Sequence, residues 1–245
     1  YDTVKVIDSL QRFITDFSTW YIRRSRDRVG PTAKSEEDKQ AFYETTYEVL
    51  VTITKLMAPI TPFISESMFR NLTGEESVHL AEWPKNVADK INQDLARKME
   101  LVRALVQVGH AKRKAEGWGV KDPQKEILVT DPGNYLEIEN DQGLHTLILE
   151  ELNTYRFSVN GKLDIRHPDY DSVTEETLKQ QGEARRIVRS IQEERKKLGT
   201  SMDERVDVTL PDWPTNFEEY IKKNALIHTL VKGESLLVTR ITSNS

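Results

Sequence analysis

The sequence predicts a multidomain α and α+β protein in which a helical bundle precedes a small α+β domain. Two observations predict this: apolar residues recur every three or four positions up to about residue 117, and the period changes to two after Gly117. We place the bundle at residues 1–117 and the α+β appendage at 118–245, with a further subdivision near residue 165. No internal repeat is evident.

The first helix is expected at residues 2–28, because apolar side chains recur there at helical spacing and form one stripe. The opposite face carries charges of alternating sign, and Gly30-Pro31 ends the helix. The stripe comprises Val6, Ile7, Leu10, Phe13, Ile14, Phe17, Trp20 and Tyr21.

Three further helices follow in the predicted bundle. Ser35 and the acidic residues after it indicate the start of the second helix, which Pro59 ends. Thr61-Pro62 begins a shorter third helix, and the fourth runs from about residue 86 to Gly117. Four amphipathic helices with short connections are typical of a bundle.

The α+β part is predicted from alternating apolar residues, as at Tyr155, Phe157 and Val159. Asn160-Gly161 predicts a hairpin turn. We expect strands at 127–129, 155–159, 206–210 and 236–241. Helical sequence follows the first strand up to residue 151, and further helices are expected at 173–198 and 215–230.

Composition excludes several classes of protein. The 245 residues include no cysteine, which rules out disulfides and cysteine catalysis, and no apolar stretch long enough to span a membrane. The histidines lack ligand spacing, so we expect no metal site. We expect a cytoplasmic location. The start at Tyr1, without an initiator methionine, indicates a piece of a longer protein.

No catalytic constellation is present in the sequence. A phosphate-binding glycine loop, a serine nucleophile elbow and a metalloprotease motif are all absent. Paired acids such as Glu36-Glu37 and Glu150-Glu151 are interpreted as solvated charge at helix edges. The sequence therefore predicts a binding module without catalytic residues and without a cofactor of its own.

Positive charge is clustered although the formal net charge is -5. The first cluster ends the first helix and comprises Arg23, Arg24, Arg26 and Arg28. Arginine forks match phosphate oxygens, and neighbouring Trp20 or Tyr21 could stack on an unpaired RNA base. Pairing of the arginines with acidic groups is an alternative of about equal weight to RNA binding. For the aromatic residues, filling the end of the core is the commoner role.

Two more clusters lie further along the chain. Lys112, Arg113 and Lys114 end the fourth helix, where cations also complement the helix dipole. Because six cations face one acid between residues 97 and 114, we favour phosphate binding there. The third cluster offers additional phosphate contacts, although a solvated helix face is the commoner explanation. It comprises Arg185, Arg189, Arg195, Lys196 and Lys197.

Several segments resemble the C-terminal, anticodon-binding region of isoleucyl-tRNA synthetases. The segment WYIRRSRDR at 20–28 is similar to one early in that region, and the likeness continues in the same order over nearly the whole chain. The later segments are FYETTYEVL at 42–50, MAPITPF at 57–63, VHLAEWP at 78–84, ILEELN at 148–153 and IVRSIQEERKKLG at 187–199. The last two are similar to the archaeal and eukaryotic type.

The resemblance implies a class I synthetase that attaches isoleucine to its tRNA using ATP, with ATP and Mg²⁺ bound in a catalytic domain outside this chain. The family's catalytic signatures, His-Ile-Gly-His and Lys-Met-Ser-Lys-Ser, are absent, so the chain should bind tRNA without aminoacylating it. The cysteine-ligated zinc module of the common bacterial type is also missing. The implied partners are tRNA for isoleucine and the remaining domains of the synthetase.

A second hypothesis remains open. The exposed, alternating strands and the low net charge also suit a protein-interaction module that docks another domain or another synthetase.

Overall fold

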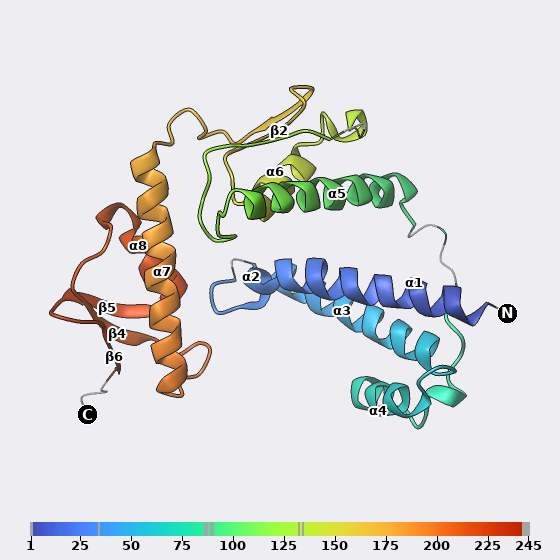
Figure 1. Cartoon of the computed structure of the whole chain (residues 1–245). Helices are drawn as coiled ribbons and strands as arrows, with labels where there is room; N and C mark the ends of the chain where they lie inside the picture. Colours follow the sequence, from blue (N-terminus) through green and yellow to red (C-terminus); the bar gives the residue numbers. More distant parts are fainter. Residues whose placement is uncertain are drawn as a thin grey trace. The chain divides into compact units, whose positions relative to one another are not determined.

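The computed structural model describes residues 2–33, 35–85, 88, 91–131, 133 and 135–241. The chain forms two compact units, Tyr1–Ala88 and Asp89–Ser245, which we describe separately (Figure 1). Helices dominate the first unit, and two small mixed sheets with helices form the second. The predicted fold class, a helical region followed by a small α+β region, is confirmed.

The first unit is helical throughout its regular structure. Helix α3 packs against α2 and α4, and a small core forms where α3 ends, around Ala58, Phe69 and Val78. The elements are α1 (Thr3–Asp16), the π-helix η1 (Phe17–Ile22), α2 (Arg26–Val29), α3 (Glu36–Met57), α4 (Pro62–Thr73) and the 3₁₀-helix η2 (Val78–Leu80).

The first helix is not continuous over residues 2–28 as predicted. It changes to π geometry at Phe17–Ile22, and a turn at Ser25 separates that segment from α2. A π segment has about one residue more per turn than an α-helix, which the spacing of apolar residues does not encode. The residues after the turn therefore point in directions that the helical stripe does not predict.

The second unit alternates long helices with short strands. Its elements are α5 (Gln93–Ala115), β1 (Ile127–Val129), η4 (Leu136–Ile138), α6 (Gln142–Leu152), β2 (Arg156–Val159), β3 (Leu163–Arg166), α7 (Glu175–Lys197), β4 (Val206–Leu210), η5 (Thr215–Phe217), α8 (Glu218–Ala225), β5 (Ile227–Lys232) and β6 (Leu237–Arg240).

Each sheet has three strands. In the first, the order is β1-β2-β3, with β1 parallel and β3 antiparallel to β2. In the second, the order is β5-β4-β6, with β5 parallel and β6 antiparallel to β4. The predicted hairpin is present: Asn160 and Gly161 both have positive φ, 53° and 69°, as a tight turn between twisted strands requires.

Helix α5 belongs to the second unit by its contacts, because it packs against α6 and β1. Its buried face includes Val102 and Leu105, and Gly109 leaves room for Leu152 of α6. The compact units therefore divide before this helix, whereas the domain boundary at 117/118 stays a prediction. Residues 86, 87, 89 and 90 of the predicted helix lie outside the described residues.

One predicted helix, at 215–230, is wrong after Ala225. Helix α8 ends at Ala225, Leu226 adopts a left-handed conformation with φ 54°, and β5 follows immediately. Tertiary pairing decides this, since β5 is the parallel neighbour of β4. The chain then crosses the end of β4 at Gly233, where a Cβ would collide with Cγ2 of Thr209.

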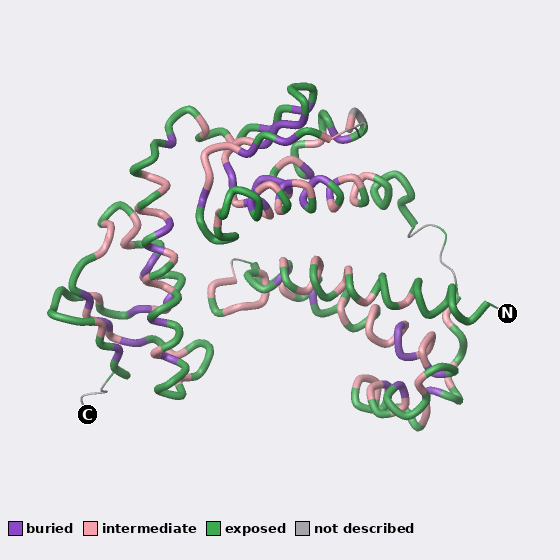
Figure 2. The backbone as a smooth tube through the Cα atoms, viewed as in Figure 1, coloured by how far each residue is buried: buried purple, intermediate pink, exposed green. Residues whose placement is uncertain are grey.

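Burial differs between the two units (Figure 2). Along α1 no residue is buried, whereas α5 and every strand of the second unit contain buried residues. Among the described residues, no helix is both long enough and apolar enough to cross a bilayer.

Candidate nucleic-acid interface

The aromatic residues of the first predicted cluster have different environments. Tyr21 stacks between Phe17 and Phe42, with ring centroids 5.4 and 5.8 Å away. The stack continues to Phe13, 6.2 Å from Phe17. Trp20, the residue before Tyr21 in the π segment, is partly exposed and has no ring partner among the described residues. Tyr21 is thus a packing residue, and Trp20 is the better candidate for stacking on a base.

Arg28 is held by a carboxylate. Its guanidinium donates to both carboxylate oxygens of Asp38, at 2.9 and 2.7 Å, and to the hydroxyl of Ser25 at 3.2 Å. It also lies over the Phe42 ring, 5.8 Å from the centroid. The hydrogen bonds to Arg28 lower the pKa of Asp38, and those to Asp38 raise the pKa of Arg28. Arg28 therefore joins α2 to α3, and little of its charge remains for RNA.

The other arginines of this cluster lie nearer to solvent. Arg23 and Arg26 are exposed, and Nε of Arg23 donates to the carbonyl of Thr19 at 2.6 Å. Arg24 is partly buried. Buried Ser25, whose N–H donates to the carbonyl of Tyr21, turns the chain between them. The turn separates Arg23 from Arg26, which lies on α2 together with Arg28.

Arg113 of the second cluster is a structural residue, which corrects its predicted role. Only 1% of its surface is exposed. Its guanidinium donates to the carbonyls of Leu152 at 2.9 Å and Asp122 at 2.6 Å, and also to that of Gly119. Burial lowers its pKa. A side chain enclosed in this way cannot reach a phosphate while the loop stays folded.

The lysines beside Arg113 point outward. Lys112 forms an ion pair with Glu116 at 2.5 Å, one turn further along the helix. Lys114 is exposed, and within the described residues it has no ion pair. Of the three predicted cations, only Lys114 is both exposed and without an ion pair among the described residues.

The third cluster is also divided. Arg195 is 3% exposed and donates to the carbonyls of Ala225 at 3.1 Å and Ser201 at 3.2 Å, so its predicted phosphate contact is corrected too. Arg189 and Lys197 form exposed ion pairs along α7, with Glu193 and Glu194 respectively. Lys196 is exposed. Arg189, Lys196 and Lys197 therefore match the alternative of a solvated helix face, whereas Arg195 does not.

Arg185 brings the second and third clusters together. Its guanidinium donates to the carbonyl of Lys121 at 3.2 Å and to Oδ1 of Asn153 at 2.7 Å. Because Arg113 donates to the same loop from α5, residues 117–122 lie between two arginines, and the charge of Arg185 contributes to the lowered pKa of Arg113.

Exposed cations surround this loop. We call Lys114, Lys121 and Arg186 the loop surface. Arg186 comes close to Gly182, which itself packs against Pro123 at the end of the loop. Within the part of the chain that the structure describes, none of the three forms an ion pair. Lys121 and Arg186 were not predicted from the sequence, because only the tertiary fold brings α7 against this loop.

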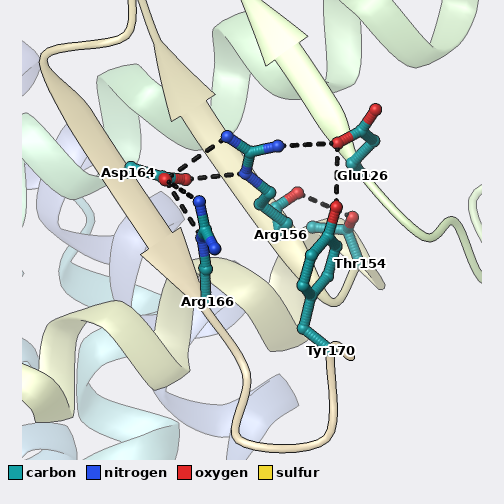
Figure 3. Close-up of polar contacts among 6 residues, drawn as sticks. All are labelled: Glu126, Thr154, Arg156, Asp164, Arg166 and Tyr170. Carbon is teal, nitrogen blue, oxygen red and sulfur yellow. Dashed lines mark hydrogen bonds and ion pairs between the residues drawn. The ribbon is translucent and has the colours of Figure 1, made fainter. Parts of the chain in front are cut away.

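A further group of cations, outside the predicted clusters, lies on the outer face of the first sheet, but acids neutralise it (Figure 3). Arg156 joins Glu126 at 2.9 Å to Asp164 at 2.8 Å, and Arg166 shares Asp164 at 2.8 Å. The pKa of Asp164 is lowered, first by its hydrogen bond from Arg156. Tyr170 donates to Glu126 at 3.2 Å. Both arginines of this network are paired with carboxylates within it, which leaves little charge for RNA.

Among the described residues, no group of three or more histidine, cysteine, aspartate or glutamate side chains could hold a metal ion. The geometry instead offers exposed cations, partly exposed Trp20 and shallow surfaces, which suit an extended polyanion better than a small substrate.

Comparison with known proteins gives a consistent result. Residues 1–129 match the family model described as the anticodon-binding domain of tRNA ligase. Isoleucine–tRNA ligases from Chlamydia trachomatis serovar A and Streptomyces avermitilis are 40% and 41% identical to the chain over 156 and 160 residues. Each match covers 62% of this chain, but only 15% and 14% of the relative. The chain thus spans about 15% of the length of these curated relatives.

Proposed function

This chain belongs to the family of anticodon-binding domains of tRNA ligases, and from that premise we propose that it binds the anticodon stem-loop of isoleucine tRNA. The parent enzyme would be an isoleucine–tRNA ligase, which attaches isoleucine to its tRNA using ATP. ATP and Mg²⁺ would bind in the catalytic domain of that enzyme, in the cytoplasm. The archaeal and eukaryotic subtype stays a prediction.

One observation carries this proposal. The matched region, residues 1–129, contains the segment 20–28 and both Lys114 and Lys121 of the loop surface. Arg23, Arg26, Lys114 and Lys121 are exposed there, whereas the guanidinium groups of Arg28 and Arg156 are held by carboxylates. Exposed arginine and lysine bind phosphates and release counterions, so affinity falls with salt.

The proposed roles follow from exposure. Arg23 and Arg26 contact phosphates, and Trp20 stacks on an unpaired base, which is how proteins read single-stranded loops. Lys114, Lys121 and Arg186 contact backbone phosphates elsewhere on the RNA. Arg28, Arg113 and Arg195 shape the protein and do not touch the RNA.

The test is the affinity of the chain for isoleucine tRNA, measured by fluorescence anisotropy over a salt series. Replacing Arg23 and Arg26 by alanine should weaken binding by about tenfold and reduce the salt slope by about 2, one unit for each lost phosphate contact. The matched control replaces Lys5 and Arg12, two exposed cations on α1, by alanine and should change neither quantity. Equal losses in the two double variants would contradict the site assignment.

We also propose that the first unit docks another domain of the synthetase. The start of α4 exposes apolar side chains, with Phe63 90% exposed and Ile64 56% exposed beside Ile60. Such side chains are usually covered by a partner. In the full-length enzyme, Phe63→Ser should lower the melting temperature, whereas in the isolated chain it should leave it unchanged. The same apolar surface could alternatively bind another synthetase, which is a second version of this proposal.

A further inference from the structure

We infer that the second unit contains two copies of one structural module, residues 92–166 and 174–240, each closed by one buried arginine. Both copies consist of a long helix, a strand, a short 3₁₀-helix, a shorter α-helix and two strands, in the same order. The subdivision predicted near residue 165 falls where the copies join. This duplication does not depend on what the chain binds.

The long helices correspond residue by residue. Both α5 and α7 have 23 residues, and an offset of 82 relates them. Their N-cap residues, Asn92 and Thr174, each accept a hydrogen bond from the backbone N–H three positions on. Both helices lead into a left-handed glycine, Gly117 with φ 71° and Gly199 with φ 65°. The same positions thus begin and end the two helices.

The buried faces of the two helices also coincide. The buried residues Val102, Gly109 and Arg113 of α5 have Ala184, Ile191 and Arg195 as their buried counterparts in α7. Among the described residues, Arg113 and Arg195 are the only buried lysines or arginines. They occupy equivalent positions in the two copies.

The two arginines make equivalent hydrogen bonds. Arg113 donates to the last residue of α6, Leu152, and Arg195 donates to the last residue of α8, Ala225. Each also donates to the carbonyl two residues after its glycine, at Gly119 and Ser201. Each arginine therefore ties the end of the long helix to the end of the short one. We call this contact the arginine clasp.

The strands keep the same register. An offset of 81 relates β1 to β4, and one of 73 relates β2 to β5. The parallel pair Ile127↔Phe157 then becomes Val208↔Leu230, and Val129↔Val159 becomes Leu210↔Lys232. In both copies a left-handed residue, Asn153 or Leu226, follows the short helix. Two unrelated segments would not share helix length, clasp and strand register together.

Where the long helix packs against the short one, a small residue is combined with a large one in each copy. Gly109 faces Leu152 in the first copy, and a Cβ at Gly109 would collide with that side chain. At the equivalent positions of the second copy, Ile191 and Ala225 are both fully buried in one core cluster. A small residue on the long helix accompanies a large one on the short helix, and the sizes are reversed in the other copy.

The copies differ in their last strand. In the first copy β3 forms a tight hairpin with β2, whereas in the second β6 pairs with β4, on the other side of the sheet. Asn160-Gly161 permits the hairpin, and Gly233 permits the crossing. The shared module therefore ends with the parallel strand pair, and the third strand follows the local turn.

The reciprocal packing gives a direct test in the full chain. Gly109→Ile alone should overpack the core and Leu152→Ala alone should leave a cavity, so each should raise the unfolding equilibrium constant by about 100-fold or more. The double variant rebuilds the pair of the second copy and should lose about tenfold or less. Losses that simply multiply in the double variant would overturn the equivalence.

If Gly109→Ile does not fold, two other experiments test the duplication: the opposite exchange of side-chain sizes in the second copy, and amide hydrogen exchange. Ile191→Gly with Ala225→Leu should again lose less than either single variant. By amide hydrogen exchange, Arg113→Met should lose protection around Gly117 and Asn153, and Arg195→Met around Gly199 and Leu226. Loss of protection in the same region with both variants would contradict two separately clasped copies.

Discussion

Two helix ends that look alike in the sequence have different roles in the structure. Residues 20–28 and 112–117 each place several cations at the end of an amphipathic helix. In the first, Arg23 and Arg26 stay exposed and Arg28 pairs with Asp38. In the second, Arg113 is buried under its own loop, while Lys114 remains outside.

The difference lies in the path of the chain after each helix. After Gly117 the chain turns back over the helix end, so that the carbonyls of Gly119 and Asp122 reach the guanidinium of Arg113. After α2 the chain leaves through Gly30 in extended conformation. A run of cations therefore marks a candidate surface, but the returning loop decides which of them meet solvent.

The largest expected effect concerns the buried arginine. Arg113→Met should lower the free energy of unfolding by about 3 to 5 kcal/mol, because it leaves buried carbonyl groups without a donor. Lys114→Met should change it by less than about 0.5 kcal/mol, as is usual at an exposed position. Chemical denaturation of both variants measures this, and similar losses would show that the two neighbours do not differ as the structure indicates.

A smaller effect is expected on RNA affinity at the second helix end. Replacing Lys114, Lys121 and Arg186 by alanine should weaken tRNA binding by about tenfold and lower the salt slope by about 2 to 3, at unchanged stability. Arg189→Ala with Lys197→Ala, which removes two paired cations, is the matched control. If the control weakens binding as much, the loop surface has no special role.

The smallest expected effect is at the Arg28–Asp38 pair, which is exposed and screened by salt. Because the pKa of Asp38 is lower in the folded protein than its usual 3.8, the pair stabilises the fold above that pH and loses its contribution as the pH falls through the folded value. The melting temperature of wild type should exceed that of Asp38→Asn slightly at pH 7 and converge with it as the pH falls below the lowered pKa of Asp38. A difference that persists at low pH would point to a role other than charge.

Local patterns predicted most of the secondary structure. The capping residue Ser35 and the left-handed Gly117 fix helix ends through contacts within a few residues. The Asn160-Gly161 turn is equally local. The π segment at 17–22 and strand β5 were missed, because the first leaves the apolar spacing nearly unchanged and the second forms by pairing with β4.

The candidate site was predicted only in part for the same reason. The sequence located the cationic segments, and Arg23, Arg26 and Lys114 are exposed as a binding role requires. It could not separate them from Arg113 and Arg195, whose partners are carbonyls up to 39 residues away in the chain. Nor could it place Arg186 near Pro123 at the end of the loop.

By itself, the sequence determined the class of fold, the family and the segments in which positive charge is concentrated, because composition, periodicity and motifs are local properties of the chain. Only the tertiary structure decided which arginines are buried, where the compact units divide, and that one module occurs twice. Burial and pairing depend on residues far apart in sequence, and two copies can keep the same contacts with reversed side-chain sizes, which hides their common pattern from the sequence.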